Sequence, residues 1–119
     1  MTGRIVLIED DRSMRELIAL HLRNAGYEVE AAEDAIAGGQ AILRARPDLL
    51  LCDVEMPYLD GYEFVAALKK DEQTRDIPVV FLSVREDVDE HAKRLGAVAY
   101  LRKPLIADRL LEVVSLYAG

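Results

Sequence analysis

Hydrophobic residues along the chain follow two spacings that alternate from one end to the other. Short, mainly apolar stretches predict buried strands at residues 4–8, 48–52, 77–82 and 99–102, and the alternating stretch 27–31 predicts a strand nearer an edge. Between them, apolar residues recur at helical spacing in the segment after Asp60 and over residues 13–25, 34–45, 86–95 and 106–117. Strict alternation of strand and helix predicts an α/β domain with a doubly wound, five-stranded parallel sheet and five helices. The pattern does not give the strand order.

The first predicted helix carries signals for its start and its end. Ser13 and Glu16 have the spacing of a capping box, and Asp11 is interpreted as an acid of the first turn. Gly26 stands where a glycine commonly ends a helix. The apolar stripe of this helix is formed by Met14, Leu17, Ile18, Leu22 and Ala25.

Two other predicted helices have weaker patterns. The second contains Gly38-Gly39, and each glycine costs about 1 kcal/mol relative to alanine in a helix, with no functional reason visible in the sequence. The helix over residues 86–95 has only Val88, Ala92 and Leu95 at helical spacing. Such a narrow stripe predicts loose docking and low local stability.

Composition restricts the class of protein. The 119 residues predict a single domain over 1–119, and a hydrophobic content of 51% is enough for one core. A net charge of -7 argues against direct binding to nucleic acid, which requires a basic face. There is no charged-then-apolar leader and no apolar run near ~18 residues, so we expect neither export nor a membrane span. The single cysteine, Cys52, is interpreted as a small buried residue of a strand, and this cysteine usage fits a cytoplasmic location.

Polar residues stand at the ends of several predicted strands. Glu9 and Asp10 follow the first strand, Asp53 the third, Ser83 the fourth and Lys103 the fifth. Because the carboxyl ends of parallel strands meet at one edge of the sheet, we expect these side chains to converge there. Crowded carboxylates repel one another unless a cation or a proton intervenes. This arrangement therefore indicates a functional site.

The residue types indicate what such a site binds. Carboxylate oxygens are hard ligands that suit Mg²⁺, with Mn²⁺ as a substitute. The acids Glu9, Asp10 and Asp53 and the base Lys103 together carry a charge of about -2, which a divalent cation offsets. A lysine and a hydroxyl add a positive charge and a hydrogen-bond donor for an anionic oxygen. Together these groups are suited to the transfer of a phosphoryl group to a carboxylate.

Short motifs surround these residues and occur in a fixed order along the chain. They are Ile8-Glu9-Asp10-Asp11, then Asp53-Val54-Glu55-Met56-Pro57 followed by Asp60-Gly61, then Phe81-Leu82-Ser83, and last Tyr100-Leu101-Arg102-Lys103-Pro104. Each motif is weak alone, but all of them at these strand ends are highly specific. Over its whole length the sequence resembles the receiver domain of two-component response regulators, which implies the flavodoxin-like (CheY-like) fold.

The resemblance implies a role for each residue of the site. Asp53 would be the phosphoacceptor, and Mg²⁺ would be held by Asp53, Asp10, Glu9 and the backbone carbonyl of Glu55. Lys103 would pair with Asp53 and then with the phosphoryl group.

The resemblance also implies a conformational switch. Ser83 would move to hydrogen-bond the phosphoryl group, and Tyr100 would turn inward behind it. The peptide bond between Lys103 and Pro104 would be cis, since X-Pro is the only common place for such a bond. Asp60-Gly61 is interpreted as a turn before the third helix. His21 and His91, which lie among polar residues, are interpreted as solvated surface residues.

The sequence departs from the family pattern in two places. Val84 stands after the switch hydroxyl, where the family usually has a small residue, and Glu55 and Arg85 occupy variable positions that tune phosphoryl lifetime. We hypothesise that Val84, together with a Glu55–Arg85 pair across the mouth of the site, slows hydrolysis of the acyl phosphate. Val98 and Ala99 replace two acids that commonly support a dimer face in winged-helix DNA-binding members, so we expect that dimer, and direct control of transcription through it, to be absent.

The sequence therefore predicts a signalling domain that takes a phosphoryl group from a histidine kinase or a histidine phosphotransfer protein. It would pass the signal through its fourth helix, fifth strand and fifth helix to an output partner or domain, as a monomer or a weak phosphorylation-dependent dimer. It would be no enzyme beyond assisting its own phosphorylation and dephosphorylation. Two alternatives stay open: an interaction module of the same fold that is never phosphorylated, and a phosphohydrolase with an aspartyl-phosphate intermediate and Glu55 as its second acid.

Overall fold

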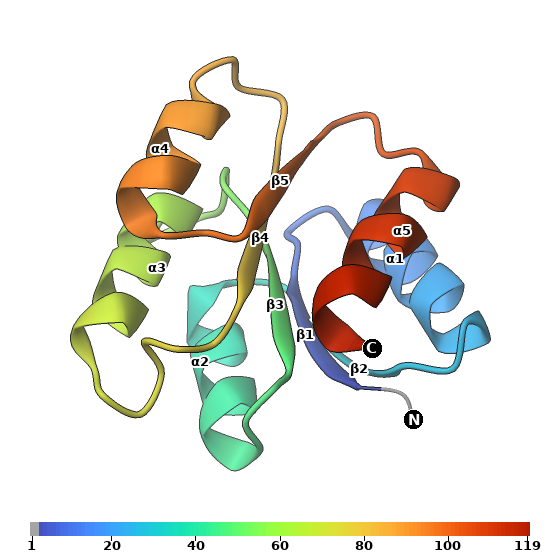
Figure 1. Ribbon diagram of the computed structural model, residues 1–119, viewed down its shortest axis with the longest axis horizontal. Coiled ribbons are helices and arrows are strands. Elements are labelled where there is room, and N and C mark those ends of the chain that lie inside the picture. Colours follow the sequence, from blue (N-terminus) through green and yellow to red (C-terminus); the bar gives the residue numbers. More distant parts are fainter. Residues whose placement is uncertain (1–2) are drawn as a thin grey trace.

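The computed structural model describes residues 3–119, and strands alternate with helices along this range (Figure 1). The strands are β1 (Arg4–Ile8), β2 (Glu28–Ala32), β3 (Leu49–Asp53), β4 (Val79–Ser83) and β5 (Ala99–Arg102). The helices are α1 (Arg12–Asn24), α2 (Ala35–Arg44), α3 (Gly61–Lys70), α4 (Val88–Leu95) and α5 (Ala107–Ala118). The predicted alternation is confirmed.

The described strands form one parallel sheet in the order β2-β1-β3-β4-β5. Helices α1 and α5 cover one face, and α2, α3 and α4 cover the other (Figure 1). Both β3 and β4 are buried along their whole length, as expected for central strands with helices on both sides. In register, Asp53 lies opposite Leu82, and Ser83 lies opposite Arg102. The strand ends therefore meet at one edge of the sheet.

Helix α1 begins differently from the prediction. Asp11 is its N-cap, and the side chain of Asp11 accepts a hydrogen bond from the backbone N of Met14 at 2.9 Å. Ser13 lies inside the first turn, so the predicted capping box is wrong: the aspartate in the loop after β1 caps the helix before the serine is reached. Leu17, predicted in the buried stripe, is 53% exposed. Gly26 follows the helix with a positive φ of 99°, as the sequence indicated.

The glycine pair of α2 has a packing explanation at one of its two positions. A Cβ atom on Gly38 would overlap the side chain of Ile8, so glycine allows α2 to approach β1 closely. A Cβ atom on Gly39 would meet only a ring carbon of Phe64 at 3.8 Å, an ordinary contact. A larger residue at Gly38 would therefore displace the side chain of Ile8, whereas one at Gly39 would not crowd its neighbours.

Cys52 is fully buried in β3 and packs in the core beneath α2, α3 and α4. Burial raises the pKa of its thiol far above the ordinary value, and the neighbouring Asp53 carboxylate raises it further. The interpretation of Cys52 as a small buried residue is confirmed.

Helix α4 docks through Val88, Ala92 and Leu95, the three residues of its predicted stripe. Its low local stability stays a prediction. Within residues 3–119, no helix combines the length and the apolar character needed to cross a membrane.

Candidate functional site

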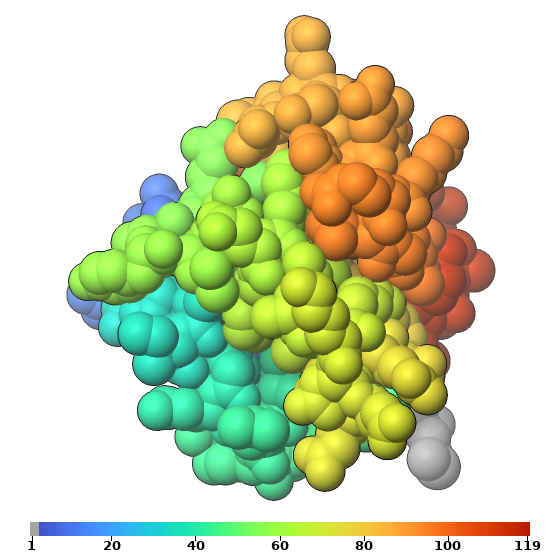
Figure 2. Space-filling view, turned by 90° about the vertical axis from the view of Figure 1, so that its left-hand side faces the viewer, coloured from blue at the N-terminus to red at the C-terminus, as the bar shows by residue number. Residues whose placement is uncertain are grey.

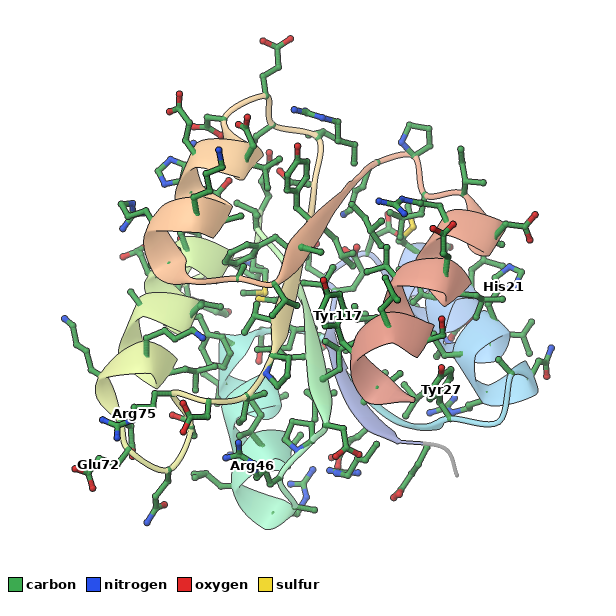
Figure 3. All side chains as sticks on the ribbon, viewed as in Figure 1. His21, Tyr27, Arg46, Glu72, Arg75 and Tyr117 are labelled. Atoms are coloured by element: carbon green, nitrogen blue, oxygen red, sulfur yellow. The ribbon has the colours of Figure 1, made fainter. Side chains whose placement is uncertain are left out.

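An acidic cleft of about 230 Å³ opens at the carboxyl edge of the sheet. Loops after β1, β3, β4 and β5 contribute its walls, which are lined by Glu9, Asp10, Asp11, Asp53, Glu55, Val84 and Lys103. Arg46 and Arg75 mark the opposite edge of the molecule (Figure 3). The acids and the lysine that the sequence predicted to converge are thus brought together.

Lys103 connects two buried carboxylates. Glu9 is 0% exposed and Asp53 is 2% exposed. The Nζ atom of Lys103 lies 2.7 Å from Oε1 of Glu9 and 3.0 Å from Oδ1 of Asp53. The peptide bond that follows Lys103 is cis, as the resemblance implied. Two carboxylates with a single ammonium leave one negative charge uncompensated in a poorly solvated place, so the site favours additional positive charge.

The charge balance of the cleft shifts the pKa of Asp53. Burial is the largest cause that raises the pKa of this carboxyl, the Glu9 carboxylate also raises it, and Lys103 lowers it; the net pKa is about 8, against an ordinary value of 3.8. Burial acts to lower the pKa of Lys103, but its hydrogen bonds to Glu9 and Asp53 outweigh burial, and the net change is upward. A cation that enters the cleft would favour the charged form of Asp53 and release its proton.

A cation has oxygen ligands available at this point. Glu9, Asp10 and Asp53 can each offer one carboxylate oxygen, and these oxygens lie within 4.8 Å of one another. Asp10 is exposed, whereas Glu9 and Asp53 are buried, so the trio is open to solvent on the Asp10 side. Glu55 lines the same cleft. A set made only of hard oxygen donors with an open side fits Mg²⁺, which usually keeps several waters.

The loop after β1 is held by contacts that the sequence did not reveal. Arg15 of α1 donates hydrogen bonds to the backbone carbonyls of Glu9 at 2.9 Å and Asp10 at 3.4 Å. The backbone N of Asp11 donates to Oε2 of Glu9 at 3.2 Å. These bonds position the two acids. Arg15 stands on a helix among polar residues, so no local signal distinguishes it from a surface arginine.

The chain after Asp53 turns closely onto α3. Asp60 is the N-cap of this helix and accepts a hydrogen bond from the backbone N of Glu63 at 2.9 Å. The backbone N of Gly61 donates to the carbonyl of Val54 at 2.8 Å. A Cβ atom on Gly61 would collide with the backbone carbonyl of Asp53, so glycine allows α3 to begin against the site. The predicted turn at Asp60-Gly61 is confirmed.

The residues of the predicted switch lie on β4 and β5. Ser83 is buried, and its Oγ accepts a hydrogen bond from the backbone N of Arg85 at 2.9 Å. Val84, the next residue, is 61% exposed and lines the cleft. Tyr100 is half-buried and packs against the core beneath α2, α3 and α4.

Comparison with protein families gives a match over residues 5–115 to the response regulator receiver domain. The chain belongs to this family. The receiver domain is 34% identical over 113 residues to the DNA-binding dual master transcriptional regulator RpaA of Synechocystis, a match that covers 93% of this chain and 47% of RpaA. It is 39% identical to the response regulator MprA of Mycobacterium bovis, with 93% and 48% covered. The receiver domain thus spans about half the length of these curated relatives.

Solved structures of similar proteins share the fold of this receiver domain. The chemotaxis response regulator CheY4 of Vibrio cholerae superposes with a TM-score of 0.90 at 29% identity, covering 98% of this chain and 99% of CheY4. The receiver domain of NtrX from Brucella abortus gives a TM-score of 0.87 at 32% identity, covering 95% and 96%. The flavodoxin-like, CheY-like architecture is confirmed.

One predicted contact at the mouth of the receiver site is not formed. Glu55 and Arg85, both within the described range, do not pair. The guanidinium of Arg85 instead lies 5.4 Å from the centre of the Tyr62 ring and donates to Oδ2 of Asp87 at 3.3 Å. Asp87 stands two residues further along the same loop, within easy reach of Arg85. The hypothesis for phosphoryl lifetime therefore rests on Val84 alone.

The interpretation of His91 as a solvated surface residue is wrong. Its ring stacks on Tyr62 with 4.2 Å between the ring centres, and its Nε2 lies 3.4 Å from Oδ2 of Asp87. Its Nδ1 lies 2.8 Å from Nη2 of Arg94. Tyr62 belongs to α3, so this partner could not be found from the local pattern around His91. His21 lies half-buried on α1 (Figure 3).

Proposed function

We propose that this receiver domain accepts a phosphoryl group on Asp53 from a histidine kinase or a histidine phosphotransfer protein, in a reaction that requires Mg²⁺. The observation that carries the proposal is the position of Lys103 between the buried carboxylates of Asp53 and Glu9, with Asp10 beside them. A purely structural ion pair would gain nothing from a third carboxylate, which adds repulsion. A divalent cation and a phosphoryl group give a role to all four side chains.

In the transfer, a carboxylate oxygen of Asp53 attacks phosphorus while the bond from phosphorus to the imidazole nitrogen of the donor breaks, and its electron pair stays on the nitrogen. Asp53 must be ionised to attack, and its raised pKa makes this depend on added positive charge. Mg²⁺, held by Glu9, Asp10, Asp53 and the backbone carbonyl of Glu55, supplies that charge when bound. Lys103, already in contact with Asp53, neutralises charge on the transferring group.

Hydrolysis ends the signal. A water oxygen attacks phosphorus, the bond to Asp53 breaks, and the carboxylate and inorganic phosphate are released. Val84 is exposed and lines the cleft, and we expect its branched side chain to hinder the approach of water to Asp53. The domain thus assists its own phosphorylation and dephosphorylation and acts as a signalling module.

Phosphorylation adds about 1.5 to 2 negative charges, which require new hydrogen-bond donors. The Oγ of Ser83 accepts a hydrogen bond from Arg85, so its own proton is available for a phosphoryl oxygen once the loop after β4 moves. Tyr100 would then turn inward. The change alters the surface of α4, β5 and α5, through which the domain acts on an output partner or domain.

Intact mass spectrometry tests the proposal. The protein is incubated with Mg²⁺ and acetyl phosphate, with and without a chelator, beside Asp53→Ala. We expect a single phosphoryl adduct that requires Mg²⁺ and is missing from the variant. Asp76→Ala, which removes an exposed acid elsewhere, is the matched control and should keep the adduct.

Two results would contradict the proposal. Absence of an adduct from both the wild type and Val84→Ala would favour a module that signals by binding alone. Steady turnover of a phosphomonoester would favour the phosphohydrolase.

A further inference from the structure

The β4–α4 loop (residues 84–87) separates the switch serine from α4. Figure 2 shows it at the top of the face formed by α3 and α4. On the inner side, Ser83 Oγ accepts a hydrogen bond from the backbone N of Arg85, and the Arg85 guanidinium lies over the Tyr62 ring. In the proposed switch, Ser83 moves toward a phosphoryl group on Asp53, and this movement would break the hydrogen bond from Arg85 and displace the loop.

Arg102 of β5 holds the same loop from the other side. Its Nη1 donates to the backbone carbonyl of Arg85 at 3.0 Å, and its Nη2 lies 3.4 Å from the carbonyl of Glu86. The same guanidinium lies 5.7 Å from the centre of the Tyr100 ring. One side chain therefore contacts both the loop that must move and the aromatic residue of the switch.

The backbone around Arg102 is firmly anchored beside the switch serine. Arg102 lies opposite Ser83 in the register of β4 and β5, and the backbone N of Lys103 donates to the carbonyl of Ser83 at 2.9 Å. Because the backbone of Arg102 is bonded into the sheet, displacement of the carbonyls of Arg85 and Glu86 away from β5 would break the hydrogen bonds that the Arg102 side chain donates. Charge-assisted hydrogen bonds of this kind oppose the movement.

We propose that Arg102 is a positioning residue that holds the β4–α4 loop in its present arrangement and so sets the cost of switching. The inference rests on the proposed function, because it concerns the rearrangement that phosphorylation of Asp53 drives. Loss of Arg102 lowers that cost, so the rearranged state is more populated before phosphorylation. A ligand that binds the rearranged state then binds more tightly.

The test uses beryllofluoride, a phosphoryl mimic, titrated in the presence of Mg²⁺ and followed by NMR. Arg102→Ala should bind about fivefold more tightly than the wild type, the size expected for loss of one or two exposed hydrogen bonds. Arg102→Lys keeps the positive charge but cannot donate two parallel hydrogen bonds as a guanidinium does, so its affinity for beryllofluoride should lie between those of the wild type and Arg102→Ala. Arg109→Ala removes an exposed arginine that pairs with Glu112 on the same side of the molecule, and should match the wild type.

A second readout separates this role from a general structural effect. In the ligand-free protein, the backbone amide signal of Arg85 should shift in Arg102→Ala toward its position in the beryllofluoride-bound wild type. The Arg109→Ala signal should stay in place. Unfolding curves establish that each variant is folded.

The outcomes distinguish the two proposals. If the wild type and all variants fail to bind beryllofluoride, the proposed function fails and this inference with it. If the wild type binds but Arg102→Ala binds equally or more weakly, with the Arg85 amide unmoved, the inference alone is overturned.

Discussion

Replacing Asp53 by asparagine should stabilise the domain at neutral pH when no divalent cation is present. Asp53 is 2% exposed, close to Glu9, and has its pKa raised to about 8, mainly by burial. At neutral pH the folded protein therefore keeps a proton on this carboxyl that the unfolded chain has released, and this difference lowers the free energy of unfolding. Asparagine keeps an oxygen that can accept the hydrogen bond from Lys103, but it carries no charge.

The size of the effect follows from the pKa difference between the folded protein and the ordinary carboxyl. The pH of 7 is about three units above the ordinary pKa of 3.8 and still below the folded pKa of about 8. Three units correspond to an upper value of about 4 kcal/mol for the destabilisation of the wild type. The cleft is open to solvent on the Asp10 side, and water there reduces the penalty. We expect a net gain of about 2 kcal/mol in the free energy of unfolding for Asp53→Asn.

The pH dependence gives the sharper test. Between about pH 4 and pH 8 the folded wild type binds more protons than the unfolded chain, so its stability falls as the pH rises. The gain in Asp53→Asn should be absent below about pH 4 and should grow up to about pH 8.

Urea denaturation across this pH range, in a metal-free buffer, measures the effect, with Asp76→Asn as an exposed control. A variant no more stable than the wild type at pH 7.5, or a difference that does not change with pH, would refute the reasoning.

Other substitutions test separate parts of the site. Mg²⁺ at one hundred times its Kd should raise the free energy of unfolding of the wild type by about 2.7 kcal/mol. Asp10→Asn should lose most of this stabilisation, which thermal unfolding measures. Equal stabilisation of both proteins by Mg²⁺ would exclude Asp10 as a ligand. Val84→Ala should lose its phosphoryl adduct severalfold faster than the wild type in time-resolved mass spectrometry, and an unchanged rate would end the hypothesis for Val84. In urea denaturation, Gly61→Ala should have a free energy of unfolding about 2 kcal/mol below that of the wild type, because the added Cβ collides with the carbonyl of Asp53. Gly39→Ala should have a free energy of unfolding up to about 1 kcal/mol above that of the wild type. Equal effects at Gly61 and Gly39 would show that the close contact of Gly61 with the Asp53 carbonyl does not account for its glycine.

Local patterns were enough to predict the elements and the edge of the sheet where the site lies. An apolar run such as residues 48–52 has few alternatives to a buried strand, and the acid that follows it must emerge at the strand end. The convergence of Glu9, Asp53 and Lys103 followed from parallel strands alone. The roles of these residues came from the resemblance and could not be derived from spacing.

Contacts between distant segments could not be predicted in the same way. The stacking of His91 on Tyr62 joins two helices, and the spacing of hydrophobic residues along the chain does not indicate which helices pack against each other. Arg85 was predicted to pair with Glu55, and its contact with Asp87 instead depends on the path of one loop. Ser13 looked like a better helix cap than Asp11 because the capping-box pattern ignores where the preceding strand ends.

The burial of Cys52 has a practical consequence for following the switch in solution. It is the only cysteine of the chain, it is fully enclosed in β3, and its pKa is raised so far that almost no reactive thiolate forms near neutral pH. A cysteine introduced at an exposed position such as Glu86 would therefore be the one site that a thiol-specific dye can label in the folded protein. The fluorescence of that dye can then report motion of the β4–α4 loop without replacement of Cys52.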